Sequence, residues 1–444
     1  MEQINEMLSQ FGVKIPDVIL PSKNVDLQKW AVVACDQWTQ STEYWEEVKK
    51  FVGSDPSTLN LIYPEVYLKN EDRAAQIKKI HKTMGDYLED SKNGNILTTP
   101  RDGAVFLERQ TTSGVRRGLL MAIDLEKYDY KKSDTIIRAT EETISDRLPP
   151  RMEIRRGAAL ELPHIMLLID DVEDILMPLL AKLLRHAPIA YETPLMMESG
   201  SVQGRLLYRK NDWNFIGNTL ELLLRTSCTK YHTKTGFLFA VGDGNHSLAA
   251  AKAVWEEYKE QHAGEQGLMQ HNARYAMAEI VNIYDDALLF EPIHRVLFNT
   301  NVDTVKKALN ILPGVKFTDC KSFSGLSTLI GDEYSGKNRI GIAGADRFIM
   351  AEFDPKPIAV VQLDKLMPSL CLNNSKNVDY IHGDKEVERI CTKTDSNAVG
   401  CLMPPFAKNT LFESVNESGM LPRKTFSMGD ASDKRFYLEC RQIF

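Results

Sequence analysis

A glycine turn that separates a strand pattern from a helix pattern constrains this chain more than any other feature. Residues 237–241 form an apolar, β-rich run of strand length, and Gly242-Asp243-Gly244 interrupts it. Apolar side chains then recur at helical spacing over 247–261, so the order is strand, tight turn, helix. Such a turn aims backbone N–H groups and the positive end of the helix dipole at one point, which favours a bound anion.

The turn, residues 242–247, also carries more polar chemistry than a simple connector needs. Asp243 is the candidate Mg²⁺ ligand, because an ion that arrives with a nucleotide needs only one or two carboxylates from the protein. The alternative is an ordinary strand–helix turn, with both glycines at positive φ and Asp243 or Asn245 as the helix cap. The turn lacks the G-x-G-x-x-G pattern, and the chain lacks a G-x-x-x-x-G-K-[ST] loop. We expect a phosphate cradle formed by Gly242, Gly244, Asn245 and Ser247, with Asp243 and His246 as catalytic groups.

Composition and charge limit the class of partner. At 444 residues the chain is long enough for about two to three domains. The formal net charge of −7 argues against nucleic acid, and no apolar run approaches the ~20 residues of a membrane span. No secretion signal is expected at the amino end. Seven cysteines without a C-x-x-C pair suit reduced thiols in the cytoplasm, where we expect the chain to act on small molecules; the sequence leaves its oligomeric state open.

The pattern of elements predicts a mixed α/β (α+β) fold in three parts, 1–134, 135–300 and 301–444. Strands are expected at 30–34, 104–109, 116–123, 165–169, 205–208, 237–241, 276–283, 339–343 and 436–440. The second and third of these pair around Thr112-Ser113-Gly114. Helices are expected at 42–51, 71–88, 172–185, 215–224, 247–261, 302–309 and 385–392.

Carboxylates and arginines gather upstream of the turn, within residues 138–156. Glu141 and Glu142 are the candidate general bases, because a carboxylate can take the proton of a substrate hydroxyl. Arg147, Arg151 and Arg155 follow, and guanidinium groups chelate phosphate oxygens bidentately. The alternative is a solvated run of charges that neutralise one another.

Two other histidines have local contexts that suggest different roles. His164 precedes an apolar strand, and we expect a packed, hydrogen-bonded side chain there. His294-Arg295 is either a polar pair capping a strand or a phosphate contact. No histidine or carboxylate cluster has the spacing of a tightly held structural metal.

The turn resembles the D-G-H-H-R turn of the ParB/sulfiredoxin-like superfamily, which includes the ADP-dependent free-serine kinases. Over most of its length the chain resembles the bacterial family called domain of unknown function 1015. This resemblance implies a ParB/sulfiredoxin-like core between flanking N- and C-terminal α/β domains. It is carried by WAVVACDQWTQSTEYWEEV (30–48), IYPEVYL (62–68), RATEET (138–143), VGDGNHS (241–247), PIHRV (292–296), VDYIHG (378–383) and GMLPRKTFSMG (419–429).

The kinase branch implies roles for individual residues. Its hydroxyl-activating glutamate matches Glu141, with Glu142 next, and its turn aspartate matches Asp243. Two departures stand out: Asn245 replaces a histidine, and Ser247 replaces a phosphate-binding arginine. The resemblance therefore leads us to expect a substitute positive charge from Arg147, Arg151 or Arg155, and a phosphate contact from the third part through Arg423, Lys424 and Thr425.

The expected function is phosphoryl transfer between an adenine nucleotide and serine or phosphoserine, with Mg²⁺. The direction is open, and transfer from phosphoserine to ADP would serve serine synthesis. Two alternatives are a non-enzymatic nucleotide-binding regulator and a phosphoserine phosphatase with water as the acceptor.

Overall fold

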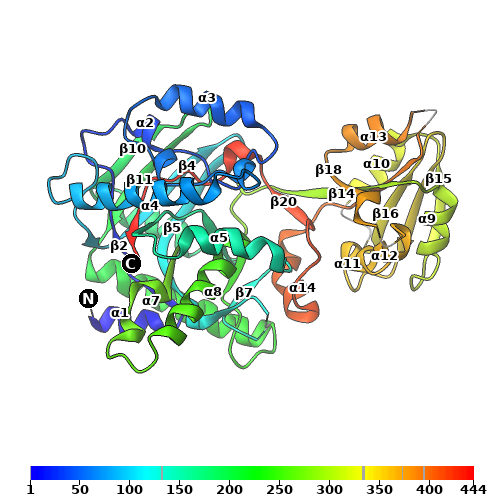
Figure 1. The fold of residues 1–444 in the computed structure, drawn as a ribbon. Helices are drawn as coiled ribbons and strands as arrows, with labels where there is room; N and C mark the ends of the chain where they lie inside the picture. Colours follow the sequence, from blue (N-terminus) through cyan, green and yellow to red (C-terminus); the bar gives the residue numbers. More distant parts are fainter. Residues whose placement is uncertain (1, 132–133, 333–335, 373, 394–395) are drawn as a thin grey trace. The chain divides into compact units, whose positions relative to one another are not determined.

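The computed structural model describes residues 2–131, 134–332, 336–372, 374–393 and 396–444. The chain divides into two compact units (Figure 1). Unit 1 comprises Met1–Leu288 with Gly429–Phe444, and unit 2 comprises Leu289–Met428. Each unit combines a sheet with helices, so the predicted mixed α/β class is confirmed.

Unit 1 is organised around a mixed sheet that has ten strands among the described residues. Its order is β10 (Ile189–Pro194), β11 (Ser201–Leu207), β4 (Ala104–Thr111), β5 (Gly114–Asp124), β13 (Tyr275–Asn282), β9 (Ile165–Ile169), β12 (Phe239–Asp243), β7 (Ile137–Ala139) and β6 (Tyr128–Asp129), with β1 (Val13–Lys14) against β5. Strands from both sides of residue 134 share this sheet, so the predicted boundary at 134/135 lies inside it. The division into three domains stays a prediction about independent folding.

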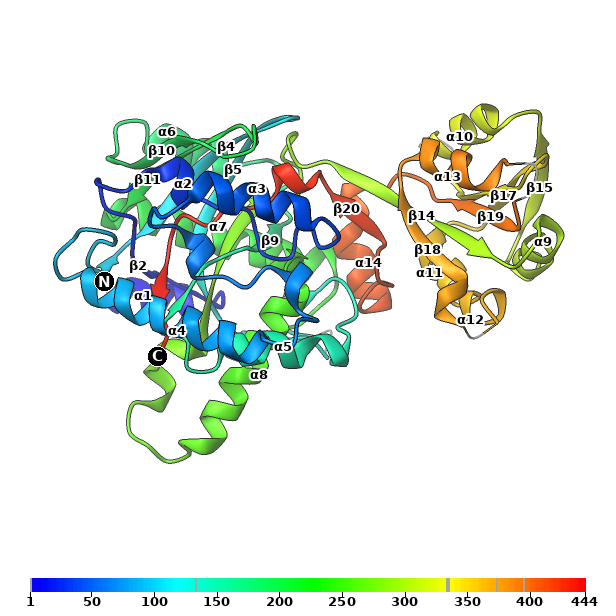
Figure 2. The same ribbon diagram turned by 45° about the horizontal axis from the view of Figure 1, so that its top comes forward.

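Helices of unit 1 pack on this sheet and on one another. Helix α8 lies beside α5 in both views of the ribbon, and these two helices contact each other (Figures 1 and 2). Leu248, Ala251 and Trp255 form part of the buried face of α8, which is the amphipathic pattern seen in the sequence. The helices are α1 (Glu2–Ser9), α2 (Leu27–Trp30), α3 (Thr42–Val52), α4 (Arg73–Asp90), α5 (Leu148–Arg155), α6 (Leu176–Leu183), α7 (Lys210–Lys230) and α8 (Asn245–Gln261).

Two predicted strands, 30–34 and 436–440, are wrong. Trp30 belongs to α2 instead, because the Asp26 carboxylate caps the amino end of that helix by accepting from the Gln28 N–H at 3.0 Å. Beyond it, Val33 makes only an isolated bridge to Phe436. Both segments are apolar because they lie in the core of unit 1, where the Trp30 indole N–H donates to the Leu438 carbonyl at 3.1 Å.

Unit 2 has its own sheet and its own apolar core. The sheet order is β15 (Lys316–Cys320), β17 (Phe348–Phe353), β16 (Asn338–Ala343), β19 (Ala398–Leu402), β14 (Phe290–Phe298) and β18 (Val378–His382), with β20 (Phe426–Met428) against β14. Its helices are α9 (Val302–Leu309), α10 (Phe323–Gly331), α11 (Ala359–Asp364), α12 (Met367–Leu370), α13 (Asp384–Cys391) and α14 (Leu411–Ser418). None of the helices in the described residues has the length and apolar content needed to span a bilayer.

Candidate functional site

The sheet of unit 1 brings the two predicted motifs to the same edge. Strands β7 and β12 are parallel, with Ala139 opposite Val241. The carboxyl ends of parallel strands lie at one edge of a sheet, so Thr140 and Glu141 emerge beside the turn although about a hundred residues separate them from it. Strand β9 runs antiparallel to β12, with Met166 opposite Asp243, so His164 at its amino end reaches the same place.

The turn has the geometry of an open helix amino end. The pairing of β12 with β9 shifts register between Val241 and Asp243, so Gly242 sits at an irregularity in the strand. Gly244 adopts φ 80°, and a Cβ there would lie 3.1 Å from the Ile165 Cα. Among the described residues no side chain caps α8, and its first internal bond is the Leu248 N–H to the Gly244 carbonyl at 2.9 Å. The dipole and the leading N–H groups of α8 therefore favour negative charge at this point.

Asn245 and His246 fasten the turn to the segment 140–144. The Asn245 side chain accepts the Thr140 N–H at 3.3 Å, and its amide nitrogen donates to the Thr140 hydroxyl at 3.3 Å. His246 Nε2 accepts the Ile144 N–H at 3.3 Å. Between these contacts, the Thr143 hydroxyl is buried and has no hydrogen-bond partner among the residues that the structure describes. The two predicted motifs are thus in direct contact, with Glu141 half-buried and Glu142 exposed.

Lys434 supplies a positive charge at the turn that sequence reasoning missed. Its Nζ lies 3.0 Å from Asp243 Oδ2, and Asp243 Oδ1 accepts the Gly244 N–H at 2.9 Å. Burial by itself would raise the pKa of Asp243, but the charge and hydrogen bond of Lys434, with the Gly244 N–H, hold this pKa below its ordinary value. No local pattern points to Lys434, because 191 residues separate it from its partner.

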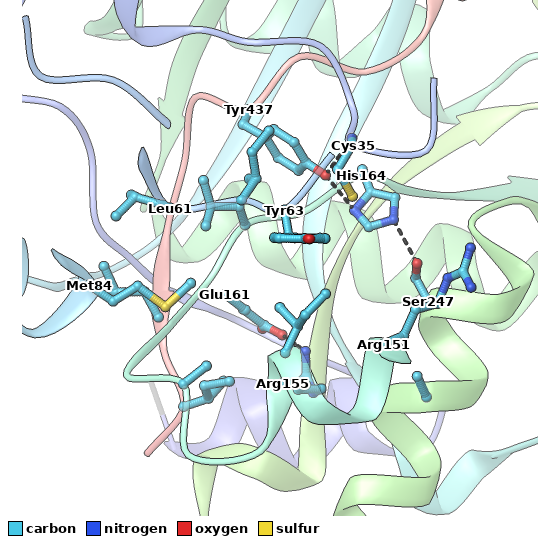
Figure 3. Close-up of a pocket in the computed structure, with 17 residues that line it drawn as sticks. Cys35, Leu61, Tyr63, Met84, Arg151, Arg155, Glu161, His164, Ser247 and Tyr437 are labelled. Atoms are coloured by element: carbon cyan, nitrogen blue, oxygen red, sulfur yellow. Dashed lines mark hydrogen bonds and ion pairs between the residues drawn. The ribbon is translucent and has the colours of Figure 1, made fainter. Parts of the chain in front are cut away.

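The Ser247 hydroxyl, predicted as a phosphate contact, is hydrogen-bonded to a histidine instead. Ser247 Oγ lies 2.8 Å from His164 Nε2, and His164 Nδ1 lies 3.0 Å from the Tyr437 hydroxyl. The predicted hydrogen-bonded state of His164 is therefore found, with Ser247 as one of its partners. Figure 3 shows the His164 ring between Tyr437 and Ser247.

The predicted substitute arginines are largely committed to other partners. Arg151 pairs with Glu65, and its Nη1 donates to the Arg147 carbonyl at 2.7 Å. Arg155 pairs with Glu161 at 2.7 Å and donates to the Tyr275 carbonyl at 3.2 Å. Arg147 is exposed at the start of α5. A phosphate role for these three side chains stays a prediction.

A cavity of about 130 Å³ lies beside the turn (Figure 3). Most of its wall is apolar, with Leu61, Ile62, Met84 and Ile154 among the lining residues. Its polar lining residues are Cys35, Tyr63, Arg151, Arg155, Glu161, His164, Ser247 and Tyr437.

The remaining predicted phosphate contacts lie in unit 2. His294 is buried: its Nδ1 accepts the Met403 N–H at 3.0 Å, and its Nε2 lies 2.8 Å from Asp384 Oδ1. Arg295 is buried against the Tyr380 ring at 5.3 Å. Both side chains therefore have structural partners, and both residues lie within β14 instead of capping a strand. Arg423 and Lys424 are exposed, whereas Thr425 is buried and donates to the Pro422 carbonyl at 2.6 Å.

Comparison with known proteins identifies the family. The family described as "Protein of unknown function (DUF1015)" matches residues 19–364. This match covers most of the chain, so the chain belongs to that family and the predicted membership is confirmed. No curated protein matches the chain.

Solved structures with a similar arrangement were also found. A free serine kinase variant in complex with ADP is 9% identical, with a TM-score of 0.37, and the match covers 74% of this chain and 94% of that one. SbnI with a C-terminal truncation, from Staphylococcus aureus, is 9% identical at a TM-score of 0.34, with coverage of 70% and 82%. A conserved hypothetical protein from Pyrococcus furiosus is 11% identical at a TM-score of 0.34, with coverage of 73% and 94%.

Proposed function

We propose that this protein transfers a phosphoryl group between an adenine nucleotide and a small hydroxy amino acid, serine or its phosphate. One observation carries the proposal: the uncapped amino end of α8 and the carboxylate-bearing segment 140–144 are held together by Asn245 and His246. An anion site and a candidate general base beside it are the two parts that phosphoryl transfer to a hydroxyl requires. The nucleotide and the serine come from the sequence resemblance.

In this proposal Glu141 takes the proton of the substrate hydroxyl, or returns it in the reverse direction. The half-buried position of Glu141 suits that role better than the exposed position of Glu142. The leading N–H groups of α8 hold the phosphoryl oxygens. The Thr143 hydroxyl, in the same segment as Glu141 and without a hydrogen-bond partner among the described residues, is a further candidate donor. His246 is a structural contact to Ile144 that keeps Glu141 and the turn together.

Lys434 takes the place of the arginine that Ser247 replaces. A lysine is a point charge suited to phosphate, and this one already lies at the turn. Its pairing with Asp243 holds the ammonium group in position before the anion arrives.

The Asp243 carboxylate is also suited to be a ligand of an Mg²⁺ ion that binds together with the nucleotide. The described residues include no group of three or more His, Cys, Asp or Glu side chains placed to hold a metal, so the protein offers a partial site. Mg²⁺ bound there would neutralise charge on the phosphate oxygens, and Lys434 would have to yield one Asp243 oxygen.

The test is to incubate the purified chain with radiolabelled phosphoserine and Mg²⁺, either with ADP or with buffer alone. Label in ATP supports the transferase. Free labelled phosphate in buffer alone favours the phosphatase, and no reaction with retained ADP binding favours the regulator. The matched pair Glu141→Gln and Glu142→Gln then assigns the base, because the loss of turnover, about 10²–10⁴-fold, should follow Glu141 alone.

A further inference from the structure

Four residues form a hydrogen-bonded chain along one wall of the cavity. The Cys35 N–H donates to the Tyr437 oxygen at 3.1 Å, and that oxygen lies 3.0 Å from His164 Nδ1. His164 Nε2 lies 2.8 Å from Ser247 Oγ, and all four residues line the cavity. Figure 3 shows these side chains in this order. The proposed phosphoryl transfer uses neither the Ser247 hydroxyl nor the His164 ring.

The hydrogen bonds that link these four residues allow His164 Nε2 to act as an acceptor. A tyrosine oxygen has two lone pairs, which accept the Cys35 N–H and the His164 Nδ1–H. A neutral imidazole with its proton on Nδ1 has a bare Nε2, and that nitrogen accepts the Ser247 hydroxyl proton. Burial raises the pKa of Tyr437 and of Cys35, so both side chains stay uncharged near neutral pH. Ser247, His164 and Tyr437 are therefore arranged like the nucleophile, the base and the orienting group of nucleophilic catalysis.

The cavity next to Ser247 suits an uncharged, mainly apolar group. Its volume of about 130 Å³ is close to that of an engineered protein cavity of about 150 Å³ that holds benzene. The two arginines of its lining are neutralised, because Arg151 pairs with Glu65 and Arg155 pairs with Glu161. An organic group of up to about six heavy atoms therefore fits better than a free anion.

The amino end of α8 offers N–H donors for the charge that would develop on a substrate that Ser247 attacks. Ser247 is the third residue of α8, so its own N–H and that of Asn245 precede the first internal bond of the helix. Backbone N–H groups and the helix dipole in such a place stabilise an oxyanion.

We propose that Ser247 is the nucleophile of a second activity, the hydrolysis of carboxylic esters with a short apolar acyl group, with His164 as its base. Ser247 Oγ bonds to the acyl carbon while its proton passes to His164 Nε2. The bond from the acyl carbon to the alkoxy oxygen then breaks, and His164 returns the proton to the departing alcohol. Water repeats the sequence: its oxygen bonds to the acyl carbon, its proton passes through His164 to Ser247 Oγ, and the carboxylic acid leaves.

This activity does not depend on phosphoryl transfer, and the test uses no nucleotide. The full chain is treated with phenylmethanesulfonyl fluoride, whose phenyl group matches the cavity and from which a serine oxygen displaces fluoride. Peptide mass mapping should place one sulfonyl adduct on Ser247. Ser247→Ala should lack the adduct, whereas Ser145→Ala, at an exposed serine of the neighbouring segment, should keep it.

The role of His164 is tested by the rate of labelling. His164→Gln should slow formation of the Ser247 adduct by about 10²-fold or more, because the hydroxyl loses its base. His186→Gln, at an exposed histidine, should label at the normal rate. Circular dichroism confirms that each variant is folded.

Ester length gives a readout on the unmodified protein. Nitrophenyl esters with two to four carbons in the acyl chain should be hydrolysed with a burst of nitrophenol, and octanoyl esters should be poor substrates because they exceed the cavity. No adduct on Ser247 with the folded chain, an adduct on Cys35 instead, or a labelling rate unchanged in folded His164→Gln would each overturn the proposal.

Discussion

Lys434 shows how a single distant residue changes the electrostatics of the turn. The first residues of α8 already favour negative charge, yet the Asp243 carboxylate beside them works against a bound anion. Lys434 offsets the negative charge of that carboxylate. The pair is largely buried, because the Asp243 side chain is 24% exposed and the Lys434 side chain is 12% exposed. Without Lys434 the turn would present a partly buried, unpaired carboxylate to an incoming phosphate.

The first prediction is that Lys434→Met weakens phosphate binding while Lys434→Arg largely preserves it. Removing the charge leaves Asp243 to repel the nucleotide, whereas arginine keeps the charge. We expect the affinity for ADP, measured by calorimetry, to fall about 10-fold or more in Lys434→Met, which corresponds to at least about 1.4 kcal/mol. Equal affinities in the two variants would mean that the anion does not bind at this turn.

Glu65 gives a prediction about pH, because its pKa is perturbed beside the cavity. Burial raises the pKa of Glu65 from 4.5 to about 6, and the charge of Arg151 opposes that rise. A carboxyl whose pKa is raised by folding contributes stability that is fully present below pH 4.5 and is lost as pH rises to about 6.

The second prediction is that the stability difference between the natural chain and Glu65→Gln depends on pH. Glutamine does not titrate, so the free energy of unfolding of the natural chain should fall relative to Glu65→Gln by about 2 kcal/mol between about pH 4 and about pH 7. Urea denaturation at each pH measures this difference. Glu47→Gln, at an exposed glutamate of α3, is the control and should show no such trend.

At the scale of elements, the strand–turn–helix unit was readable from the sequence because its signals are local. The predicted strands 104–109 and 116–123 correspond to the antiparallel pair β4 and β5, and the helix 302–309 and the strand 165–169 coincide with α9 and β9. The predicted strands 30–34 and 436–440 failed because an apolar run signals burial as well as a strand.

The candidate site was readable only where its residues are neighbours in sequence. Residues 242–247 and the segment around Glu141 were singled out by their own composition, and the parallel pairing of β7 with β12 brings them together. Lys434 and the link from Ser247 to His164 had no such signal, because they join segments that meet only after folding. Arg151 and Arg155 were assigned to phosphate because the sequence does not reveal Glu65 and Glu161 as their partners.

The third prediction concerns Gly244, because its positive φ and the close backbone of β9 both oppose a side chain there. Gly267, which precedes the short 3-10 helix Leu268–Gln270, has φ 85° and ψ 0° but open space around its Cβ position, so Gly267→Ala costs only the strain of a left-handed backbone, about 1–2 kcal/mol. Gly244 has φ 80° and would also place a Cβ 3.1 Å from the Ile165 Cα of β9. Gly244→Ala should therefore destabilise the chain by at least about 1 kcal/mol more than Gly267→Ala, measured by urea denaturation.

Gly244→Ala should also weaken ADP binding, because the change moves the amino end of α8 relative to β9. Gly267→Ala should bind ADP with normal affinity, since Gly267 lies beyond the carboxyl end of α8, away from the turn. If both variants keep normal affinity, the geometry of this turn is not what holds the nucleotide.

At the scale of the whole molecule, the segment 429–444 completes unit 1 by pairing with its buried carboxylates. Arg435 lies 2.6 Å from Glu279, and Arg441 lies 2.6 Å from Glu161. Gly118 on the neighbouring strand makes room for the first pair, because a Cβ there would lie 2.3 Å from Glu279 Oε1. The same segment places Lys434 at the turn and Tyr437 in the lining of the cavity. Unit 1 is thus built from the two ends of the chain, with unit 2 inserted between them.

The last prediction is that truncation after Met428 unfolds unit 1 and spares unit 2. The truncation removes Arg435 and Arg441, so Glu279 and Glu161 are each left with one arginine, Arg116 and Arg155 respectively, and losing such a buried partner costs up to about 3–5 kcal/mol. Two such losses, together with the apolar side chains of 436–443 that leave the core, are comparable with the ~5–15 kcal/mol that stabilises a whole domain. Unit 2 keeps all members of its two apolar clusters, because they lie within 289–428. Hydrogen exchange read out by mass spectrometry should therefore show protection lost in the strands of unit 1 and retained in β14, β16 and β19. Retained protection of β9 and β12 in the truncated chain would show that unit 1 is complete without its carboxyl-terminal segment.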